Sequence, residues 1–581
     1  MKISLRHQLI IVAAAALLFV PFLGRVHLFD WDEVNFAECA REMLVTGDYG
    51  TVRINYEPFW EKPPLFIWMQ AASMELFGVS EFAARLPNAL CGILTLLLLF
   101  RIGSKIYDKQ FALLWVLAYA GSLMPHFYFK SGIIDPWFNL FIFLGIWRFT
   151  LYMQYAGGPG TQGFWNKDIA LSALFIALAV LTKGPVALLV FGLCFVVWRL
   201  LKRAPLMRWK HFGLYVLAAG FVGGVWFLIL AAQGRAHIIV DFIVYQIRLF
   251  NTEDAGHGGP FYYHWIVLLI GCFPASIPAI PGLFRGGADT TMERGMKRSM
   301  RVLFWVVLIL FSIVKTKIVH YSSLCWFPLT YLAAYAAYKM INGQLHWKKW
   351  MSGLFIGIAS VLALAFTLLP FIEQYKHRLV ESALIKDPFA IDSLLRPVDW
   401  GGYEFVTGIL LLLGAGSALW GLYRKRYLPA FYILFGATLV TTNLAALLLA
   451  PRVEQYSQAP AIRFFKEAAK QNVYSESLGY KSYAQFFYGR RQPGIAQNPL
   501  YLKWRAAQSA GFLEPQGAAS VSENEIRLQR EWMLRGEIDR PAWFACRNTA
   551  AEEMRKAYPH LKEVRREGGF VFFAREAGSV Q

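Results

Sequence analysis

The sequence predicts an α-helical polytopic membrane protein that ends in a small soluble α/β domain. Of its 581 residues, 56% are hydrophobic and only 17% are charged, whereas about a quarter of the residues in an average soluble domain carry charge. Aromatic residues reach 16%, so the apolar side chains exceed what a water-exposed surface can hide. These proportions exclude an ordinary soluble enzyme.

Apolar runs explain this composition, because a helix needs about 20 apolar residues to cross a bilayer, and about thirteen such runs can be marked. The first extends from Leu9 to Leu23, and no small-residue cleavage site follows it, so we interpret it as a retained span rather than a signal peptide. The other runs cover residues 87–105, 111–127, 133–153, 169–181, 185–200, 212–232, 262–283, 302–314, 318–338, 354–369, 405–423 and 428–449.

The positive charges orient these spans. Dense Lys and Arg clusters recur in every second loop, at residues 101–109, 199–210, 285–301, 339–349 and 424–426. Cytoplasmic loops carry such an excess, so the net charge of +20 indicates membrane topology rather than nucleic-acid binding. We expect a cytoplasmic N-terminus in the plasma (inner) membrane, with the intervening loops on the external, periplasmic side.

The chain divides into two predicted domains. Residues 1–450 form the transmembrane domain, whose first external loop spans residues 25–85, and an odd number of spans leaves residues 451–581 outside. In this last segment, helix-like stretches at 461–470 and 522–534 alternate with strand-like runs at 544–547 and 569–574, as in a small α/β domain. The six cysteines stand singly, which supports neither a disulfide framework nor a zinc site.

The first external loop carries an acidic cluster that includes Asp30, Asp32 and Glu33. One of the aspartates suits a helix N-cap, but capping does not explain a cluster this acidic. Because Asp32 and Glu33 are adjacent, they point in different directions on a helix. We expect one to face a site and the other to make structural bonds.

A second motif in this loop is Trp60-Glu61-Lys62-Pro63-Pro64. A solvated turn with a weak surface ion pair is the plain alternative. The prolines, however, hold Lys62 in a fixed direction beside the membrane, which suits binding of a lipid headgroup.

Further polar residues lie at the external ends of the spans. Lys183 occupies a very short turn, where snorkelling to the interface deserves equal weight. Lys317, His320 and Tyr321 are clustered too closely to be explained by snorkelling. Asp135 precedes Pro136 and either caps a helix or braces the first loop.

The external loop of residues 233–261 contains Arg248 and the glycine-rich stretch around His257, which is typical of a mobile loop over a substrate. His257 and His264 lack the i, i+4 spacing of a helical zinc pair, so we predict no metal ligands. No motif requires a cofactor, and a divalent cation stays an open alternative.

Carboxylates and cations beside a bilayer suit a reaction between a lipid-carried donor and an external acceptor. When a sugar leaves a lipid phosphate, negative charge grows on the departing oxygen and preplaced cations stabilise it. Lys62, Arg248 and Lys317 suit this role. Asp32 suits proton removal from an acceptor hydroxyl. A single displacement needs one carboxylate, so we expect inversion at the sugar.

Several motifs carry a family resemblance: Asp32-Glu33 with Ala37-Glu38 and Arg41-Glu42-Met43, then Trp60 to Leu65, then Leu181 to Pro185, then Lys317 with His320-Tyr321. In this order they resemble the protein O-mannosyltransferase-like membrane glycosyltransferases, and most of all the bacterial branch that includes the lipid A aminoarabinose transferase. The resemblance covers the membrane part. It implies the GT-C fold, with about thirteen spans and an external C-terminal domain.

The resemblance also implies residue roles. Asp32 matches the essential acidic residue of the first loop, Lys62, Arg248 and Tyr321 match contacts of the lipid phosphate, and Glu61 and Asp135 match cavity residues. Asn35 stands where lipid A transferases tend to carry an arginine, which argues against phosphate-bearing lipid A as the acceptor. The complete expected site comprises catalytic Asp32 and Glu33, donor-phosphate ligands Lys62, Arg248, Tyr321 and Lys317, and cavity residues Glu61, Asp135, Lys183, His257 and His320.

The sequence thus predicts a monomeric glycosyltransferase that uses a polyprenyl-phosphate sugar and a lipid, glycan or protein acceptor. The sugar, pentose or hexose, is left open. A transporter or flippase of lipid-linked sugars is the alternative, since intramembrane charges also mark permeation routes. Inverted repeats would favour it, but we find no repeat, and the charges gather at one end of the spans.

Overall fold

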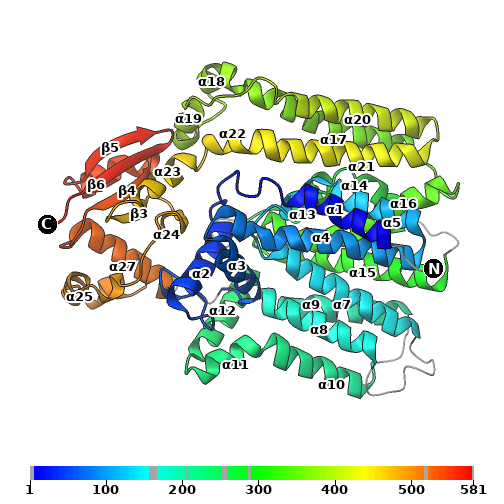
Figure 1. Cartoon of the computed structure of the whole chain (residues 1–581), viewed down its shortest axis with the longest axis horizontal. Coiled ribbons are helices and arrows are strands. Elements are labelled where there is room, and N and C mark those ends of the chain that lie inside the picture. The colour runs from blue at the N-terminus through cyan, green and yellow to red at the C-terminus, as the bar shows by residue number, and fades with distance from the viewer. Residues whose placement is uncertain are drawn as a thin grey trace.

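The chain forms a long bundle of helices with a β-sheet beyond one end (Figure 1). This computed structural model describes residues 5–59, 61–155, 166–202, 207–251, 258–284, 289–515 and 521–578. Two helices of the first loop, α2 (Asp32–Thr46) and α3 (Leu65–Phe77), lie between the long helices and the sheet. A short hairpin of β1 (Arg53–Ile54) and β2 (Glu57–Pro58) separates them in the chain.

The remaining helices of the membrane part follow in chain order. They are α1 (Leu5–Phe19), α4 (Glu81–Ile106), α5 (Lys109–Ala120), α6 (Leu123–Tyr128), α7 (Asp135–Tyr155), α8 (Lys167–Lys183), α9 (Val186–Lys202), α10 (Trp209–Ala218), α11 (Val225–Ala232), α12 (His237–Asn251), α13 (Tyr263–Gly271), α14 (Ser276–Phe284), α15 (Thr291–Ile313), α16 (Trp326–Ile341), α17 (Lys349–Leu368), α18 (Ile372–Glu381), α19 (Pro388–Leu395), α20 (Val406–Tyr423) and α21 (Tyr427–Leu444). The 3₁₀ segment η3 (Val319–Cys325) joins α15 to α16.

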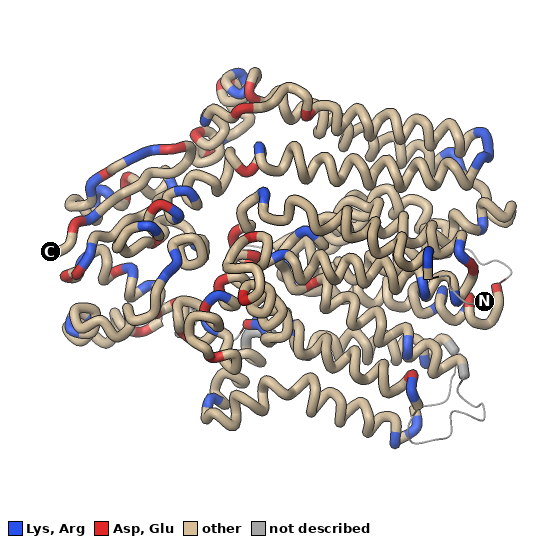
Figure 2. The backbone as a smooth tube through the Cα atoms, viewed as in Figure 1, with Lys and Arg blue, Asp and Glu red and all other residues tan. Residues whose placement is uncertain are grey.

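Several helices are suited to crossing a bilayer. Among the described residues, four are long and apolar enough, Glu81–Ile106, Lys349–Glu381, Val406–Tyr423 and Tyr427–Gln455, or up to six if each of two bent pairs is one span. Charged residues lie mostly toward the two ends of the bundle, with long uncharged stretches of backbone between them (Figure 2). These features are consistent with a multi-pass membrane protein, whereas the number of about thirteen spans stays a prediction.

Two of the predicted spans are bent in the structure. The run 212–232 bends by 53° between the segment ending at Gly223 and α11, and the run 262–283 bends by 117° between α13 and α14. The first break carries Gly223 and Gly224 after a π-helical turn, and glycine weakens a helix. The second contains Pro274, which has no N–H for the helical ladder. The hydropathy of the sequence predicts neither of these two breaks.

The C-terminal segment contains a mixed four-stranded sheet in the order β3-β4-β6-β5. Its strands are β3 (Tyr474–Leu478), β4 (Ala542–Arg547), β5 (Lys562–Glu567) and β6 (Phe570–Arg575), with β3 and β4 parallel and the other pairs antiparallel. Its helices include α22 (Ala450–Gln455), α23 (Ala459–Ala468), α24 (Ala484–Phe487), α25 (Pro499–Ala506), α26 (Ala510–Leu513), α27 (Val521–Arg535) and α28 (Asn548–Ala557). Trp532, Phe544 and Phe573 are buried at its core.

The predicted elements 461–470, 522–534, 544–547 and 569–574 coincide with α23, α27, β4 and β6. The sequence analysis missed β3 and β5, because β3 carries polar side chains and β5 is a charged, largely exposed edge strand. Whether residues 451–581 fold as a separate soluble domain stays a prediction.

The C-terminal segment is bound directly to the first loop. Arg41 in α2 donates to the Arg491 carbonyl at 2.8 Å, and Asn55 donates to Gln529 at 3.0 Å. The His27 ring lies 2.5 Å from the Glu454 carboxylate. The C-terminal segment therefore packs against the same loop that carries the acidic cluster.

Close approach of α17 and α20 depends on Gly408. A Cβ atom at this position would lie 2.1 Å from the Thr367 hydroxyl and 2.3 Å from the Ala363 carbonyl oxygen. Small residues let membrane helices approach closely in this way. Gly416, in the same helix, has no such neighbour within 4 Å.

We expect Gly408→Val to separate these helices and lower the free energy of unfolding by about 1–3 kcal/mol, the usual cost of overpacking. Thermal unfolding in detergent micelles would measure the change. Gly416→Val is the matched control and should leave the melting temperature close to that of the parent protein. Equal melting temperatures for the two variants would contradict the close approach.

Candidate active site

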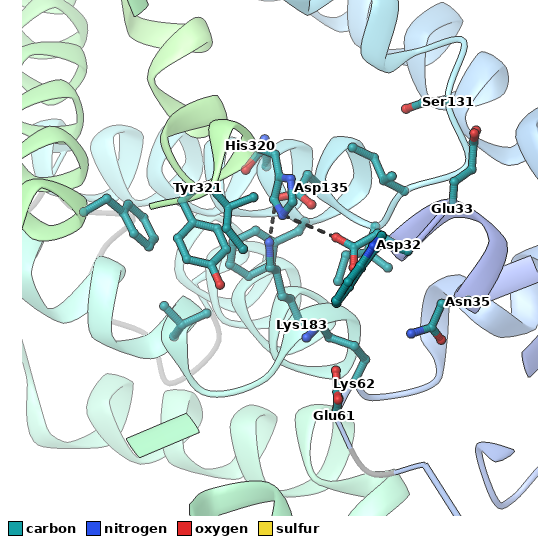
Figure 3. Close-up of a pocket in the computed structure, with 18 of the residues that line it drawn as sticks. Asp32, Glu33, Asn35, Glu61, Lys62, Ser131, Asp135, Lys183, His320 and Tyr321 are labelled. Atoms are coloured by element: carbon teal, nitrogen blue, oxygen red, sulfur yellow. Dashed lines mark hydrogen bonds and ion pairs between the residues drawn. The ribbon is translucent and has the colours of Figure 1, made fainter. Parts of the chain in front are cut away.

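A cavity of about 500 Å³ lies beside the start of α2 (Figure 3). Nine of the expected site residues line it, although they come from distant parts of the chain. They are Asp32, Glu33, Glu61, Lys62, Asp135, Lys183, Arg248, His320 and Tyr321. A cavity of this size, with a few convergent polar groups, is typical of a small-molecule site.

Asp32 is the first residue of α2 and presents its carboxylate to the cavity. The carboxylate lies 3.5 Å from Nε2 of His320, and the Asp32 side chain is 41% exposed. Trp31 precedes it with a φ of 76°, a conformation that is uncommon for a bulky residue. Neither Asp30 nor Asp32 is the N-cap residue of α2, so capping does not explain the acidic cluster.

The Glu33 side chain is buried and is turned away from the Asp32 carboxylate. Both of its oxygens accept from the Arg85 guanidinium, at 2.7 and 2.8 Å. They also accept from the backbone amides of Phe29 at 2.7 Å and Gly132 at 2.5 Å. The catalytic role expected of Glu33 stays a prediction, and this arrangement occupies both of its oxygens. It gives Glu33 the structural bonds expected of one of the two adjacent carboxylates.

Arg85, from α4, extends the same network. Its guanidinium also donates to the carbonyl oxygens of Leu23, Val26 and His27, at 2.6 to 2.9 Å. These three residues belong to the segment that leads into α2. One buried cation thus fixes the start of α2 and with it the position of Asp32.

Lys183 and Asp135 form a buried ion pair that lines the cavity. The Lys183 ammonium lies 2.6 Å from the Asp135 carboxylate, and these side chains are 14% and 3% exposed. The ammonium also lies 5.4 Å from the centre of the Tyr321 ring and 5.7 Å from that of Phe138, within cation–π range. Lys183 therefore faces the site instead of snorkelling to the interface.

Lys317, one of the expected residues, is not brought to the cavity. The Lys317 ammonium donates to the carbonyl oxygens of Phe311, Ser312 and Val314, at 3.0, 2.7 and 2.5 Å. The last carbonyls of α15 lack helical partners and carry the negative end of the helix dipole, so they attract this cation. Its expected role in phosphate binding is therefore unsupported. His257 lies outside the described residues.

The sequence analysis missed three cavity residues from the C-terminal segment: Lys481, Tyr483 and Glu523. The Lys481 ammonium lies 2.6 Å from the Glu523 carboxylate and 5.1 Å from the centre of the Trp31 ring. No local pattern marks these residues, because only the packing of the C-terminal segment onto the first loop brings them here.

Asp30 completes this contact between the two segments. Its carboxylate accepts from the backbone amides of Trp31 at 2.9 Å and Tyr483 at 3.2 Å. Burial raises the pKa of Asp30, although these amide hydrogen bonds favour its ionised form. Asp30 thus joins the loop before α2 to the loop that carries Lys481.

Within the described ranges, no three His, Cys, Asp or Glu side chains gather closely enough to hold a metal ion. Basic side chains among the described residues line the cavity: Lys62, Lys183, Arg248 and Lys481.

We expect Arg85→Ala to leave the buried Glu33 carboxylate without its cation, which costs about 3–5 kcal/mol in comparable buried pairs. Thermal unfolding of the purified protein would report the loss. Arg101→Ala is the matched control, since Arg101 lies in the same helix with an exposed side chain. Similar melting temperatures for the two variants would contradict the anchoring role of Arg85.

Comparisons with known proteins agree with the motifs. A family model described as dolichyl-phosphate-mannose-protein mannosyltransferase matches residues 61–227. The undecaprenyl phosphate-alpha-4-amino-4-deoxy-L-arabinose arabinosyl transferase of Edwardsiella ictaluri is 29% identical over 360 residues, which are 60% of this chain and 63% of that protein. Its counterpart in Pectobacterium carotovorum is 28% identical over 371 residues, 62% of this chain and 65% of that protein. The chain thus covers less than two thirds of these relatives.

Solved structures extend the likeness to nearly the whole chain. The crystal structure of ArnT from Cupriavidus metallidurans bound to undecaprenyl phosphate has a TM-score of 0.72, with 19% sequence identity over 99% of this chain and 100% of that one. Its apo state has a TM-score of 0.71. The chain therefore has the fold of these GT-C membrane proteins, and the family match confirms its resemblance to the protein O-mannosyltransferase-like family.

Proposed function

We propose that this protein is an integral-membrane glycosyltransferase that moves a sugar from a polyprenyl-phosphate donor to an acceptor at the external face of the membrane. The observation that carries the proposal is a single cavity in which the half-exposed Asp32 carboxylate shares walls with Lys62, Arg248 and Tyr321. The relatives are named as transferases of undecaprenyl-phosphate aminoarabinose, and the matched crystal structure holds undecaprenyl phosphate.

In this proposal, Lys62, Arg248 and Tyr321 bind the lipid phosphate. Negative charge develops on the phosphate oxygen as its bond to the sugar breaks, and fixed cations stabilise that charge in the transition state. Asp32 accepts the proton of the acceptor hydroxyl as it attacks. His320, 3.5 Å away, orients the carboxylate, and the Lys183–Asp135 pair shapes the wall beside it. One carboxylate suffices for a single displacement with inversion.

The wider architecture belongs to the same proposal. Residues 1–450 form the transmembrane domain with about thirteen spans, and residues 451–581 form a periplasmic α/β domain. The protein acts as a monomer in the inner membrane, and its acceptor is a lipid, a glycan or a protein. Cations from side chains at the cavity support phosphate chemistry, and a divalent cation is an optional addition. The flippase alternative finds no support in the relatives, which are named as transferases.

Asp32→Asn should abolish transfer while leaving the fold intact, because the amide cannot accept the proton but has the same shape. Purified enzyme, a polyprenyl-phosphate sugar and an acceptor extract would measure transfer, and thermal unfolding would check folding. Glu75→Gln is the matched control, since Glu75 is an exposed carboxylate of α3. Unchanged turnover in Asp32→Asn would sink the catalytic assignment.

Lys62→Ala should weaken binding of polyprenyl phosphate about ten- to a hundredfold, because a charge-assisted hydrogen bond contributes roughly 1.5–3 kcal/mol. Binding of a labelled polyprenyl phosphate to protein in nanodiscs would test this. Lys470→Ala, at an exposed position of the C-terminal segment, is the control. Equal affinities for all three proteins would remove Lys62 from the donor site.

A further inference from the structure

A second cavity, of about 440 Å³, lies in the C-terminal segment between the end of β3 and α27. It shares Lys481, Tyr483 and Glu523 with the first cavity, so the two spaces meet at these side chains. The ion pair of Lys481 and Glu523 is partly exposed, with side chains 41% and 32% accessible. A ligand held in the second cavity could therefore reach past this pair toward Trp31 and Asp32.

Two residues that line this cavity each carry a buried polar atom without a hydrogen-bond partner in the described part of the protein: the Tyr480 hydroxyl and Oε1 of Gln485. Gln485 is 1% exposed. Its amide nitrogen is fixed by Glu476 at 2.8 Å and by the Ser482 carbonyl at 2.9 Å. Buried polar groups are nearly always paired, so each exception requires an explanation. A bound ligand would supply the missing partners.

The lining indicates the chemistry of that ligand. Its ionisable groups balance in sign, with Lys481, Arg527 and Arg530 against Glu476, Glu523 and Glu531. This balance favours a neutral ligand over a phosphate. The Tyr480 hydroxyl can donate and Gln485 Oε1 can accept, and sugar hydroxyls do both. The rings of Tyr480, Tyr483 and Tyr558 also line the cavity and offer apolar faces with polar tips.

We propose that the second cavity binds the saccharide part of the acceptor and presents its reactive hydroxyl to Asp32. This inference rests on the proposed glycosyltransferase function and assigns the C-terminal segment a part in choosing the acceptor. A site that hydrogen-bonds a substrate hydroxyl strongly rejects analogues that lack it, because its own polar groups are then left unpaired. Tyr480 and Gln485 are the specificity-determining residues.

The test uses the full chain in nanodiscs. The probe is the saccharide fraction released by mild acid from the envelope of a strain that lacks this protein, labelled with a fluorophore at the reducing ends. Tyr480→Phe should weaken its binding about three- to tenfold, the range of one neutral hydrogen bond, and Arg530→Ala should weaken it as well. Tyr375→Phe and Lys556→Ala are matched controls at exposed positions outside the cavity. Binding of polyprenyl phosphate should be unchanged in all four variants.

Three results would overturn the inference. They are no saccharide binding by the parent protein, equal binding by Tyr480→Phe, or Tyr480-dependent binding only of a peptide fraction from the same envelope. If the parent protein transfers sugar while Tyr480→Phe binds saccharide normally, the inference about the second cavity is wrong and the proposed function stands. If the parent protein binds saccharide but transfers no sugar from a polyprenyl-phosphate donor, the proposed function fails and the acceptor role fails with it.

Discussion

The ion pair between Arg85 and Glu33 is the contact on which the site depends. It joins α4 to the first turn of α2, and the remaining donors of Arg85 hold the backbone that leads into that turn. Buried charge is costly unless every partner is present, so this network permits one geometry of the loop. Asp32, the residue immediately before Glu33, inherits that geometry while its own carboxylate stays open to the cavity. The two adjacent acids thereby differ in their surroundings, since Glu33 is held in a buried network and Asp32 presents its carboxylate to the cavity.

The C-terminal segment completes the site from the other side. Asp30 accepts the Tyr483 amide, and Arg41 donates to the Arg491 carbonyl, so the first loop is held between the bundle and the sheet. Lys481, Tyr483 and Glu523 form a wall shared by the two cavities. A donor phosphate would bind beside the basic side chains of the first cavity. A saccharide would bind against the C-terminal segment, and the two would meet at Asp32.

The sequence predicted much of this arrangement from local patterns. Asp32, Lys62 and Lys183 were recognisable because charged residues beside apolar runs have few structural reasons to be there. The pattern could not distinguish Lys183, which turns to Asp135 in the cavity, from Lys317, whose ammonium is held by the last carbonyls of α15. Whether such a lysine faces the cavity or the end of its own helix depends on the path of the backbone over a single turn. Nor could it predict the partner of Glu33, since Arg85 lies 52 positions away.

Hydropathy likewise identified α4, α20 and α21 but not the bends at Gly223 and Pro274. A helix bends where its backbone hydrogen bonds are interrupted. Hydropathy averaged over a run of residues contains no information about those hydrogen bonds. In the C-terminal segment, strands with apolar runs were predicted, whereas the polar β3 and the charged edge strand β5 were not.

The chain order of the cavity residues has a consequence for biosynthesis. Asp32 is near the start of the chain, whereas Lys481 and Glu523 arrive only in its last fifth. A nascent chain that has already inserted its helices still lacks one wall of its cavity. Assembly of the cavity therefore waits for the synthesis of residues 481–523, and shorter nascent chains do not enclose the same space.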